Sequence, residues 1–191
     1  MKPGIFIPGL IILFLAVAAP GCKESGSGSI ENGEESSGNL LLNPSFESNG
    51  VPSLEHWSVQ DTFLVRFSAD VPPGGGSFSV SIEANWGPPG FVRTALPVPA
   101  GVHRYRLSWW GKKSGQIYGG AYLGIQKSDT LILFLPKTSY TSDSTWAEYA
   151  SLDTITTEAG DKLVVTFSGG VSQWLTGTTY FDLCSLEILY P

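Results

Sequence analysis

The sequence has little of the residue chemistry that metal-dependent and nucleophilic enzymes use. Its 191 residues include two cysteines, two histidines and one methionine. The short patterns of zinc and serine hydrolases, His-Glu-x-x-His and Gly-x-Ser-x-Gly, are absent. His56 and His103 have no Cys, Asp or Glu at the spacing that metal ligands show. We therefore expect no enzyme of these classes.

Clusters of basic residues are also missing. The formal net charge is −6 and the pI is about 4.8. An acidic chain without runs of Lys or Arg lacks the positive surface that attracts nucleic acid or anionic lipid. We expect no nucleic-acid partner, and no membrane contact that is held by charge.

Helical periodicity is nearly absent from Asn39 onward. Short alternating or apolar runs are separated instead by turns rich in Gly and Pro. Many short strands at even spacing predict one all-β domain, a sandwich or barrel, over residues 39–191. The expected strands are Asn39–Leu42, Thr62–Ser68, Phe78–Ala84, Gly90–Leu96, Arg104–Trp110, Gln116–Gln126, Leu131–Pro136, Trp146–Leu152, Lys162–Ser168 and Thr178–Tyr190.

The first 22 residues, MKPGIFIPGLIILFLAVAAPGC, follow the pattern of a bacterial lipoprotein signal. Lys2 precedes an apolar run, and small or turn-forming residues precede Cys22. We expect residues 1–21 to be removed as a signal peptide and Cys22 to carry the lipid. Ordinary secretion and an uncleaved anchor are the alternatives, because Ala19 stands where lipoproteins usually have Leu.

Residues 22–38 predict a disordered tether between the lipid and the domain. They are rich in Gly, Ser and Glu, and Ile30 is their one large apolar residue. Lys23 follows the cysteine, in place of the Asp associated with inner-membrane retention. We expect a cell-envelope protein on the outer membrane, facing either the periplasm or the surface.

Cys184 has no partner for an intramolecular disulfide if Cys22 is lipidated. Alternation places Cys184 on the same strand face as Leu186 and Ile188. We expect it to be a small buried hydrophobic residue, with a reactive thiol as the alternative.

Alternation also assigns faces to the strand RYRLSWWG. Tyr105, Leu107 and Trp109 share the expected core face. Arg106 and Trp110 share the opposite face.

The segment GQIYGGAYLGIQ divides in the same way, with its aliphatic residues on the core face. Tyr118, Tyr122 and Gln126 share the other face. Gly120 and Gly124 lie beside the tyrosines and would leave their rings uncovered.

Several motifs along the chain resemble one family. NLLLNPSFESNG followed by HWSV is similar to the opening Asn-Leu-Leu-x-Asn-Gly-x-Phe-Glu, then Gly-Trp, of carbohydrate-binding modules of the galactose-binding-like jelly-roll group, families 4, 9, 16 and 22. The segments LPVPAGVHRYRLSWWGKKSG and YFDLCSLEIL resemble the middle and closing strands of these modules. Pro44 replaces the Gly of the opening motif, and Leu183 replaces the second Asp of the closing one. The resemblance implies a β-sandwich jelly roll with a saccharide as ligand.

The resemblance also implies a structural calcium ion. Glu47 of the opening motif and Asp182 of the closing strand would hold it, together with backbone carbonyls near Gly76–Phe78. The alternative is that Glu47 is a turn residue and that Asp182 is solvated or bonded to backbone N–H groups.

Aromatic side chains are abundant, with 6 Trp, 7 Tyr and 10 Phe. Flat aromatic faces stack on the apolar C–H faces of sugar rings, and a few polar groups bond the hydroxyls. We expect Trp57, Trp109 and Trp146 to lie in the core. The expected ligand-binding residues lie on the other strand faces or at loop tips, with packing under loops as their alternative: Trp110, Tyr118, Tyr122, Arg106, Gln126 and Trp86.

Together these features predict a lipid-anchored, exported, non-catalytic carbohydrate-binding module. Its partners would be a polysaccharide, the membrane through the lipid, and other envelope proteins. One alternative is a surface module of the same fold that binds protein or has a structural role. Another is a glycan-active enzyme using Glu83 and Glu148, which are carboxylates on predicted strands.

Overall fold

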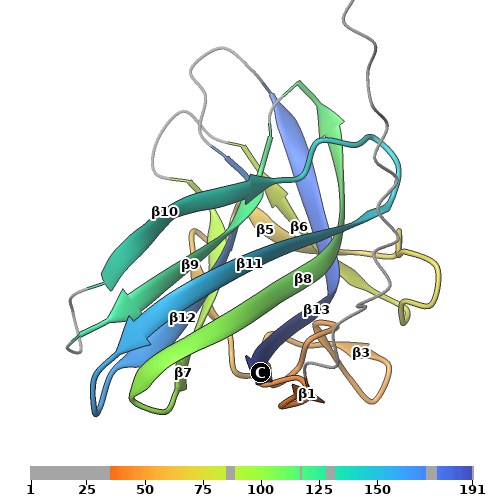
Figure 1. Cartoon of the computed structure of the whole chain (residues 1–191). Coiled ribbons are helices and arrows are strands. Elements are labelled where there is room, and N and C mark those ends of the chain that lie inside the picture. The colour runs from red at the N-terminus through yellow and green to blue at the C-terminus, as the bar shows by residue number, and fades with distance from the viewer. Residues whose placement is uncertain (1–34, 85–88, 117, 128–131, 171–175, 191) are drawn as a thin grey trace, which may run out of the picture. The chain divides into compact units, whose positions relative to one another are not determined.

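The computed structural model describes residues 35–84, 89–116, 118–127, 132–170 and 176–190. They form two large antiparallel sheets and one small one (Figure 1). The strands are β1 Glu35–Ser36, β2 Glu47–Ser48, β3 Val51–Pro52, β4 Ser58–Gln60, β5 Val65–Ser68, β6 Ser79–Glu83, β7 Phe91–Pro97, β8 Gly101–Gly115, β9 Gly120–Gln126, β10 Ile132–Tyr140, β11 Ala147–Thr157, β12 Lys162–Ser168 and β13 Gly177–Tyr190.

One sheet has the order β11-β8-β13-β6-β5, with β1 paired to β13, and we call it the β8 sheet. The other has the order β10-β9-β12-β7-β4, and we call it the β9 sheet. Strands β2 and β3 form a separate hairpin. Neighbours in both large sheets are mostly far apart in sequence, as in a jelly roll, and the expected all-β sandwich is confirmed.

The core lies between the inner faces of the two large sheets. The predicted core face of β8 is confirmed, because Tyr105, Leu107 and Trp109 are all buried. Phe167 of β12 is the centre of an aromatic cluster. Its ring centroid lies 4.9 to 6.4 Å from the centroids of Phe46, Trp57, Trp109 and Phe181.

Trp146 is wrongly predicted as a core residue. It precedes β11 and lies half-buried outside the core cluster. The centroid of its ring lies 5.5 Å from the Lys112 ammonium, and alternation from the buried Trp109 places Lys112 on the outer face of the β8 sheet.

The opening segment of the domain is fastened to β13 by Asn39. Its side-chain amide donates to the carbonyl of Cys184 at 2.9 Å, and its Oδ1 accepts from the backbone N–H groups of Leu41 and Leu186 at 3.0 Å each. The strand expected over Asn39–Leu42 is absent, because side-chain bonds replace part of the ladder there.

The ordered domain begins earlier than expected. Glu35 and Ser36 form β1, which pairs with Tyr190 and Leu189 beside the C-terminal end of β13 (Figure 1). The tether was predicted to extend to residue 38, so two of its residues, Glu35 and Ser36, belong instead to the β8 sheet. Cys22 and the rest of the tether and signal lie outside the described residues.

Cys184 is a buried core residue, as predicted, and burial raises the pKa of its thiol well above the usual value. A bulge between Asp182 and Ser185 shifts the register of β13 against β8. Leu183 takes a left-handed backbone conformation there, with φ of 47°. Because of the bulge, Asp182 lies on the outer face of β13, buried against Gly75, while Cys184 faces the core.

Across the described ranges of the chain, we find no helix with the length and hydrophobicity that crossing a lipid bilayer requires.

Candidate functional site

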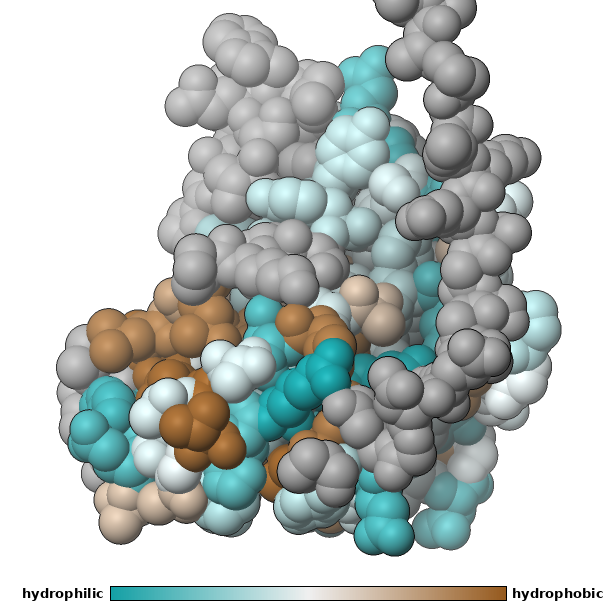
Figure 2. All heavy atoms as spheres, in the orientation of Figure 1, coloured by the Kyte–Doolittle hydropathy of each residue, from teal (hydrophilic) through white to brown (hydrophobic). Residues whose placement is uncertain are grey.

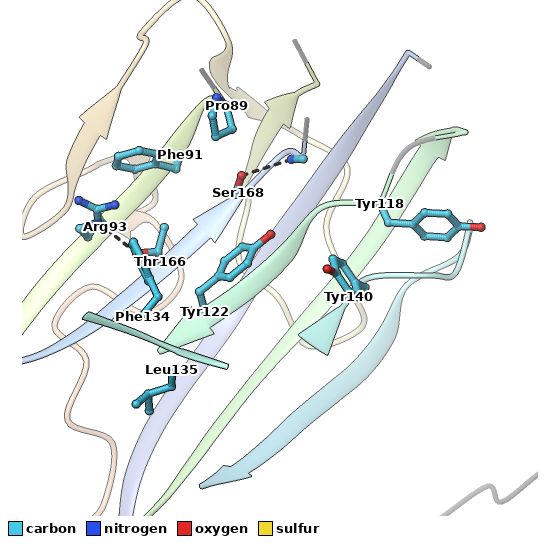
Figure 3. Close-up of a pocket in the computed structure, with 11 residues that line it drawn as sticks. Pro89, Phe91, Arg93, Tyr118, Tyr122, Phe134, Leu135, Tyr140, Thr166 and Ser168 are labelled. Carbon is cyan, nitrogen blue, oxygen red and sulfur yellow. Dashed lines mark hydrogen bonds between the residues drawn. The ribbon is translucent and has the colours of Figure 1, made fainter. Parts of the chain in front are cut away.

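The outer face of the β9 sheet carries a pocket of about 600 Å³, which is within the size range of small-ligand sites (Figure 3). Strands β7, β9, β10 and β12 supply most of its wall. The described lining residues are Pro89, Phe91, Arg93, Tyr118, Tyr122, Phe134, Leu135, Tyr140, Thr166, Ser168 and Gly170.

Strand register assembles this wall from segments that are distant in sequence. Tyr122 of β9 pairs with Thr166 of β12, and Thr166 pairs with Arg93 of β7. Phe91 pairs with Ser168 in the next row. Because side chains alternate along a strand, all five project from the same outer face.

Arg93 is held between two aromatic rings at one end of the pocket (Figure 3). Its guanidinium carbon lies 4.2 Å from the ring centroid of Phe91 and 5.5 Å from that of Phe134. Its Nε donates to Thr166 Oγ1 at 3.1 Å. Burial lowers the pKa of Arg93 below the usual value. The guanidinium is thus fixed in place and partly removed from water.

Three tyrosines line the rest of the pocket (Figure 3). Tyr122 is half-buried, and its ring meets Phe134 edge to face with centroids 6.5 Å apart. Burial, and then the neighbouring Tyr140, raise the pKa of Tyr122. Tyr118 and Tyr140 are about half exposed, at 49% and 56%. These rings offer flat apolar surface with a hydroxyl at each tip, the combination that suits sugar rings.

Hydrophobic surface adjoins the pocket at the start of β10. Figure 2 shows hydrophobic residues gathered there, and Leu133 and Phe134 are 48% and 50% exposed. The pocket is therefore open to solvent at an apolar edge, and is accessible to an extended ligand.

The structure brings together only part of the ligand-binding set predicted from sequence. Tyr118 and Tyr122 line the pocket. Trp110 and Arg106 lie on β8, which belongs to the other sheet, so they do not line this pocket, and their part in ligand binding stays a prediction. The alternation rule gave their face correctly but could not say which sheet each strand joins.

Gln126 ends β9 and does not line the pocket. Trp86 lies outside the described residues. Its part in ligand binding stays a prediction.

Sequence reasoning missed Phe91, Arg93 and Phe134. The signal for the first two was present in FVRTALP, the sequence of β7. Val92 and Leu96 are buried, and the same alternation places Phe91 and Arg93 on the outer face.

A second aromatic cluster lies on the outer face of the β8 sheet. Asp70 accepts a hydrogen bond from Trp146 Nε1 at 2.8 Å and forms an ion pair with Lys112. The Lys112 ammonium lies 4.8 Å from the ring centroid of Tyr180. The bond from Lys112 and then that from Trp146 lower the pKa of Asp70. These side chains form their hydrogen bonds and ionic contacts with one another.

Glu47 and Asp182, the predicted calcium ligands, lie against two consecutive glycines. A Cβ on Gly75 would come within 2.8 Å of Asp182 Oδ2, and one on Gly76 would overlap the Glu47 carboxylate. Glu47 also accepts a hydrogen bond from the backbone N–H of Phe78. The sequence therefore folds so that two carboxylates and a glycine-rich turn converge.

Asp182 carries an unsatisfied buried oxygen in this arrangement. Its Oδ1 accepts from the Leu183 N–H at 2.7 Å, but its Oδ2 has no partner among the described residues. Burial, opposed by the Leu183 bond and assisted by the charge of Glu47, raises the pKa of Asp182 to about 7. A buried oxygen beside a second carboxylate fits a hard cation that takes oxygen ligands. No group of three His, Cys, Asp or Glu side chains is placed to hold a metal among the described residues, so backbone carbonyls would complete the set.

The carboxylates considered as catalytic residues lie away from the pocket. The described lining of the pocket contains no Asp, Glu, His or Cys. Glu83 and Glu148 are exposed on β6 and β11 of the β8 sheet, and Glu83 lies 3.7 Å from Arg66 in an ion pair. These carboxylates do not face the pocket.

Comparisons with known proteins identify the fold. No protein-family model matches the chain, and no curated protein sequence matches it. The solved structure of TmCBM61 in complex with β-1,4-galactotriose is 21% identical, with a TM-score of 0.51 over 78% of this chain and 97% of that one. The CBM22-1 xylan-binding domain from Paenibacillus barcinonensis Xyn10C is 15% identical, with a TM-score of 0.55 over 81% and 97%.

The same fold also occurs in an enzyme. A cyclase from Fischerella sp. TAU is 14% identical, with a TM-score of 0.54 over 81% of this chain and 98% of that one. This chain therefore has the jelly-roll fold of the carbohydrate-binding modules that its motifs resemble, and the fold alone does not fix a function.

Proposed function

We propose that this protein is a non-catalytic carbohydrate-binding module whose ligand occupies the pocket on the β9 sheet. The observation that carries the proposal is the lining itself, in which three tyrosines and two phenylalanines surround Arg93, Thr166 and Ser168. Rings of this kind stack on the C–H faces of pyranoses, while the polar groups bond hydroxyls. Two proteins of the same fold are described as a complex with galactotriose and as a xylan-binding domain, which supports a saccharide ligand.

The proposal extends to location. The signal-like sequence of residues 1–21, the cysteine that follows it and the polar segment behind Cys22 support lipid anchoring at the cell envelope, with the domain held away from the membrane surface. A module so placed would keep a polysaccharide close to the cell without cleaving it.

The calcium site belongs to the same proposal. Glu47 and Asp182 would supply carboxylate oxygens, and the backbone around Gly75 and Gly76 would supply carbonyls. The ion would neutralise the buried Asp182 and the half-buried Glu47, and would link β13 to the segment that carries β2. It would have a structural role, since the two carboxylates lie on the β8 sheet side, on segments that do not line the pocket.

Affinity electrophoresis of the full chain through gels containing galactan, xylan or β-glucan tests the proposal. The expected result is retardation by at least one polysaccharide, with no sugar released on incubation. If no polysaccharide retards the chain while envelope proteins are retained by it, the module binds protein instead. If reducing ends appear and their release depends on Glu83 or Glu148, it is an enzyme.

A further inference from the structure

Arg93 is the one formally charged side chain in the described lining of the pocket. The pocket thus has a local charge opposite to that of the whole chain, whose net charge is −6. No carboxylate of the described residues forms an ion pair with Arg93. A guanidinium that is partly removed from water usually has such a partner, because desolvating an unpaired charge is unfavourable.

The contacts of Arg93 also fix the direction in which it can bind. Its guanidinium carbon lies over the rings of Phe91 and Phe134, and its Nε donates to Thr166. Neither terminal nitrogen has an acceptor among the described residues. The two rings accept no conventional hydrogen bond, so the terminal N–H groups remain free to donate to a ligand. A planar fork of this kind matches a carboxylate, which accepts two parallel hydrogen bonds.

Sugar-binding surface lies beside this fork. Tyr122 of β9 pairs with Thr166 of β12, the residue that accepts the hydrogen bond from Arg93. The ring of Tyr122 also contacts the ring of Phe134. A pyranose on Tyr122 would lie one strand away from Arg93, because Thr166 lies between the two residues. The exocyclic carbon of the pyranose is a substituent that could extend to Arg93. When that carbon is a carboxylate, as in a uronic acid, the ligand supplies both the stacking ring and the missing anion.

We propose that the pocket is selective for acidic saccharides, with Arg93 binding the carboxylate of a uronic acid residue. This inference rests on the proposed saccharide-binding function and adds the chemical class of the ligand. The negative charge of the rest of the chain is screened beyond about 8 Å at physiological ionic strength, so the contact with Arg93 decides the preference.

Isothermal titration calorimetry with charged and neutral forms of the same oligosaccharide tests this selectivity. The probes are hexamers of α-1,4-galacturonate and of β-1,4-glucuronate, each paired with its methyl ester, at 150 mM salt. The full chain is kept in a polyoxyethylene detergent, because detergents with sugar headgroups would compete. We expect at least one acid to bind about tenfold or more tightly than its ester, as charge-assisted hydrogen bonds imply.

Two matched variants assign the preference to Arg93. Arg93→Gln should bind acid and ester within about twofold of each other, because an amide has no charge to distinguish them. Arg66→Gln removes the same charge from an exposed ion pair on the β8 sheet and should retain the wild-type preference. Thermal melts show whether each variant is folded.

The outcomes separate the inference from the function on which it rests. Equal binding of acid and ester by the wild-type chain overturns the acidic-ligand proposal and leaves saccharide binding intact, and this result needs no variant to fold. A preference that survives in folded Arg93→Gln also overturns it. If the chain binds none of the four oligosaccharides and none of the neutral polysaccharides, the proposed function itself is overturned.

Discussion

Trp110 and Tyr122 lie on the outer faces of opposite sheets of the sandwich. Trp110 is on β8, opposite Glu148 of β11, and Tyr122 is on β9, opposite Thr166 of β12. The core of packed side chains separates these two outer faces. One short saccharide cannot stack on both rings, and the pocket of the β9 sheet includes Tyr122 alone of the two.

Tyr122→Ala should therefore weaken saccharide binding and Trp110→Ala should not. Removing a stacked ring costs about 0.5–1.5 kcal/mol beyond the loss of contact area, which predicts a tenfold or larger rise in Kd for Tyr122→Ala. Retardation in polysaccharide gels measures the effect, with Trp110→Ala as the matched loss of an aromatic ring. Loss of binding in Trp110→Ala with wild-type binding in Tyr122→Ala would move the site to the β8 sheet.

The fold was largely predictable because its signals are local. Alternation and turn residues gave nine of the ten strand positions approximately, and Lys162–Ser168 has the same bounds in the structure. Asn39–Leu42 failed because the side chain of Asn39 bonds to β13 in place of a regular ladder. The short strands β1, β2, β3 and β4 were missed, since two or three residues hold too little pattern.

The site was less predictable because it depends on which strands become neighbours. Alternation placed Trp110 and Tyr122 correctly on outer faces. It did not show that β8 joins β13 while β9 joins β12, because long-range pairing leaves no periodic trace in either strand. Arg93 was missed since a single charged residue in a strand is usually a solvated one. Its place in the pocket depends on the contact with Phe134, which is distant in sequence.

Trp109→Ala should destabilise the domain strongly. Trp109 is fully buried, stacks on Tyr149 with centroids 5.6 Å apart, and donates to Thr141 Oγ1 at 3.3 Å. Truncating a buried aromatic residue costs about 3–5 kcal/mol. Trp146→Ala is the comparison, because this half-exposed ring should cost roughly 1 kcal/mol. Urea unfolding followed by circular dichroism measures both, and equal losses would contradict the assignment of Trp146 to the outer face.

Calcium should raise the stability of the folded chain, if Glu47 and Asp182 hold it. A ligand that binds only the folded state at 100 times its Kd adds about 2.7 kcal/mol. Chelator should therefore lower the Tm of the wild type, and the Asp182→Asn variant should not respond. Glu148→Gln, which removes an exposed carboxylate from the same sheet, should respond as the wild type does. An unchanged wild-type Tm in chelator would remove calcium from the proposal.

Asp70 should contribute stability that is lost in acid. Its folded pKa is lowered from 3.8 by Lys112 and Trp146, so its contribution is present above that value and disappears as pH falls through the lowered pKa. Because the side chain is half exposed, we expect only about 0.2–1 kcal/mol. Urea unfolding should show Asp70→Asn below the wild type at pH 6 and the two converging towards pH 2. A gap that is constant across this range would show that the ion pair with Lys112 is not its source.

Cys22→Ser should abolish lipid attachment. The prediction rests on the apolar run before Cys22 and on the chemistry of the thiol, which can form a thioether with diacylglycerol where a serine hydroxyl does not. In bacteria fed a labelled fatty acid, the wild type should incorporate label and sediment with membranes. The variant should carry no label, and should be either soluble or retained as a larger precursor that keeps its signal.

Cys184→Ser is the matched control, because Cys184 is buried in the core and cannot accept a lipid in the folded domain. Label in Cys22→Ser, or none in the wild type, would show that the envelope holds the module by some other means.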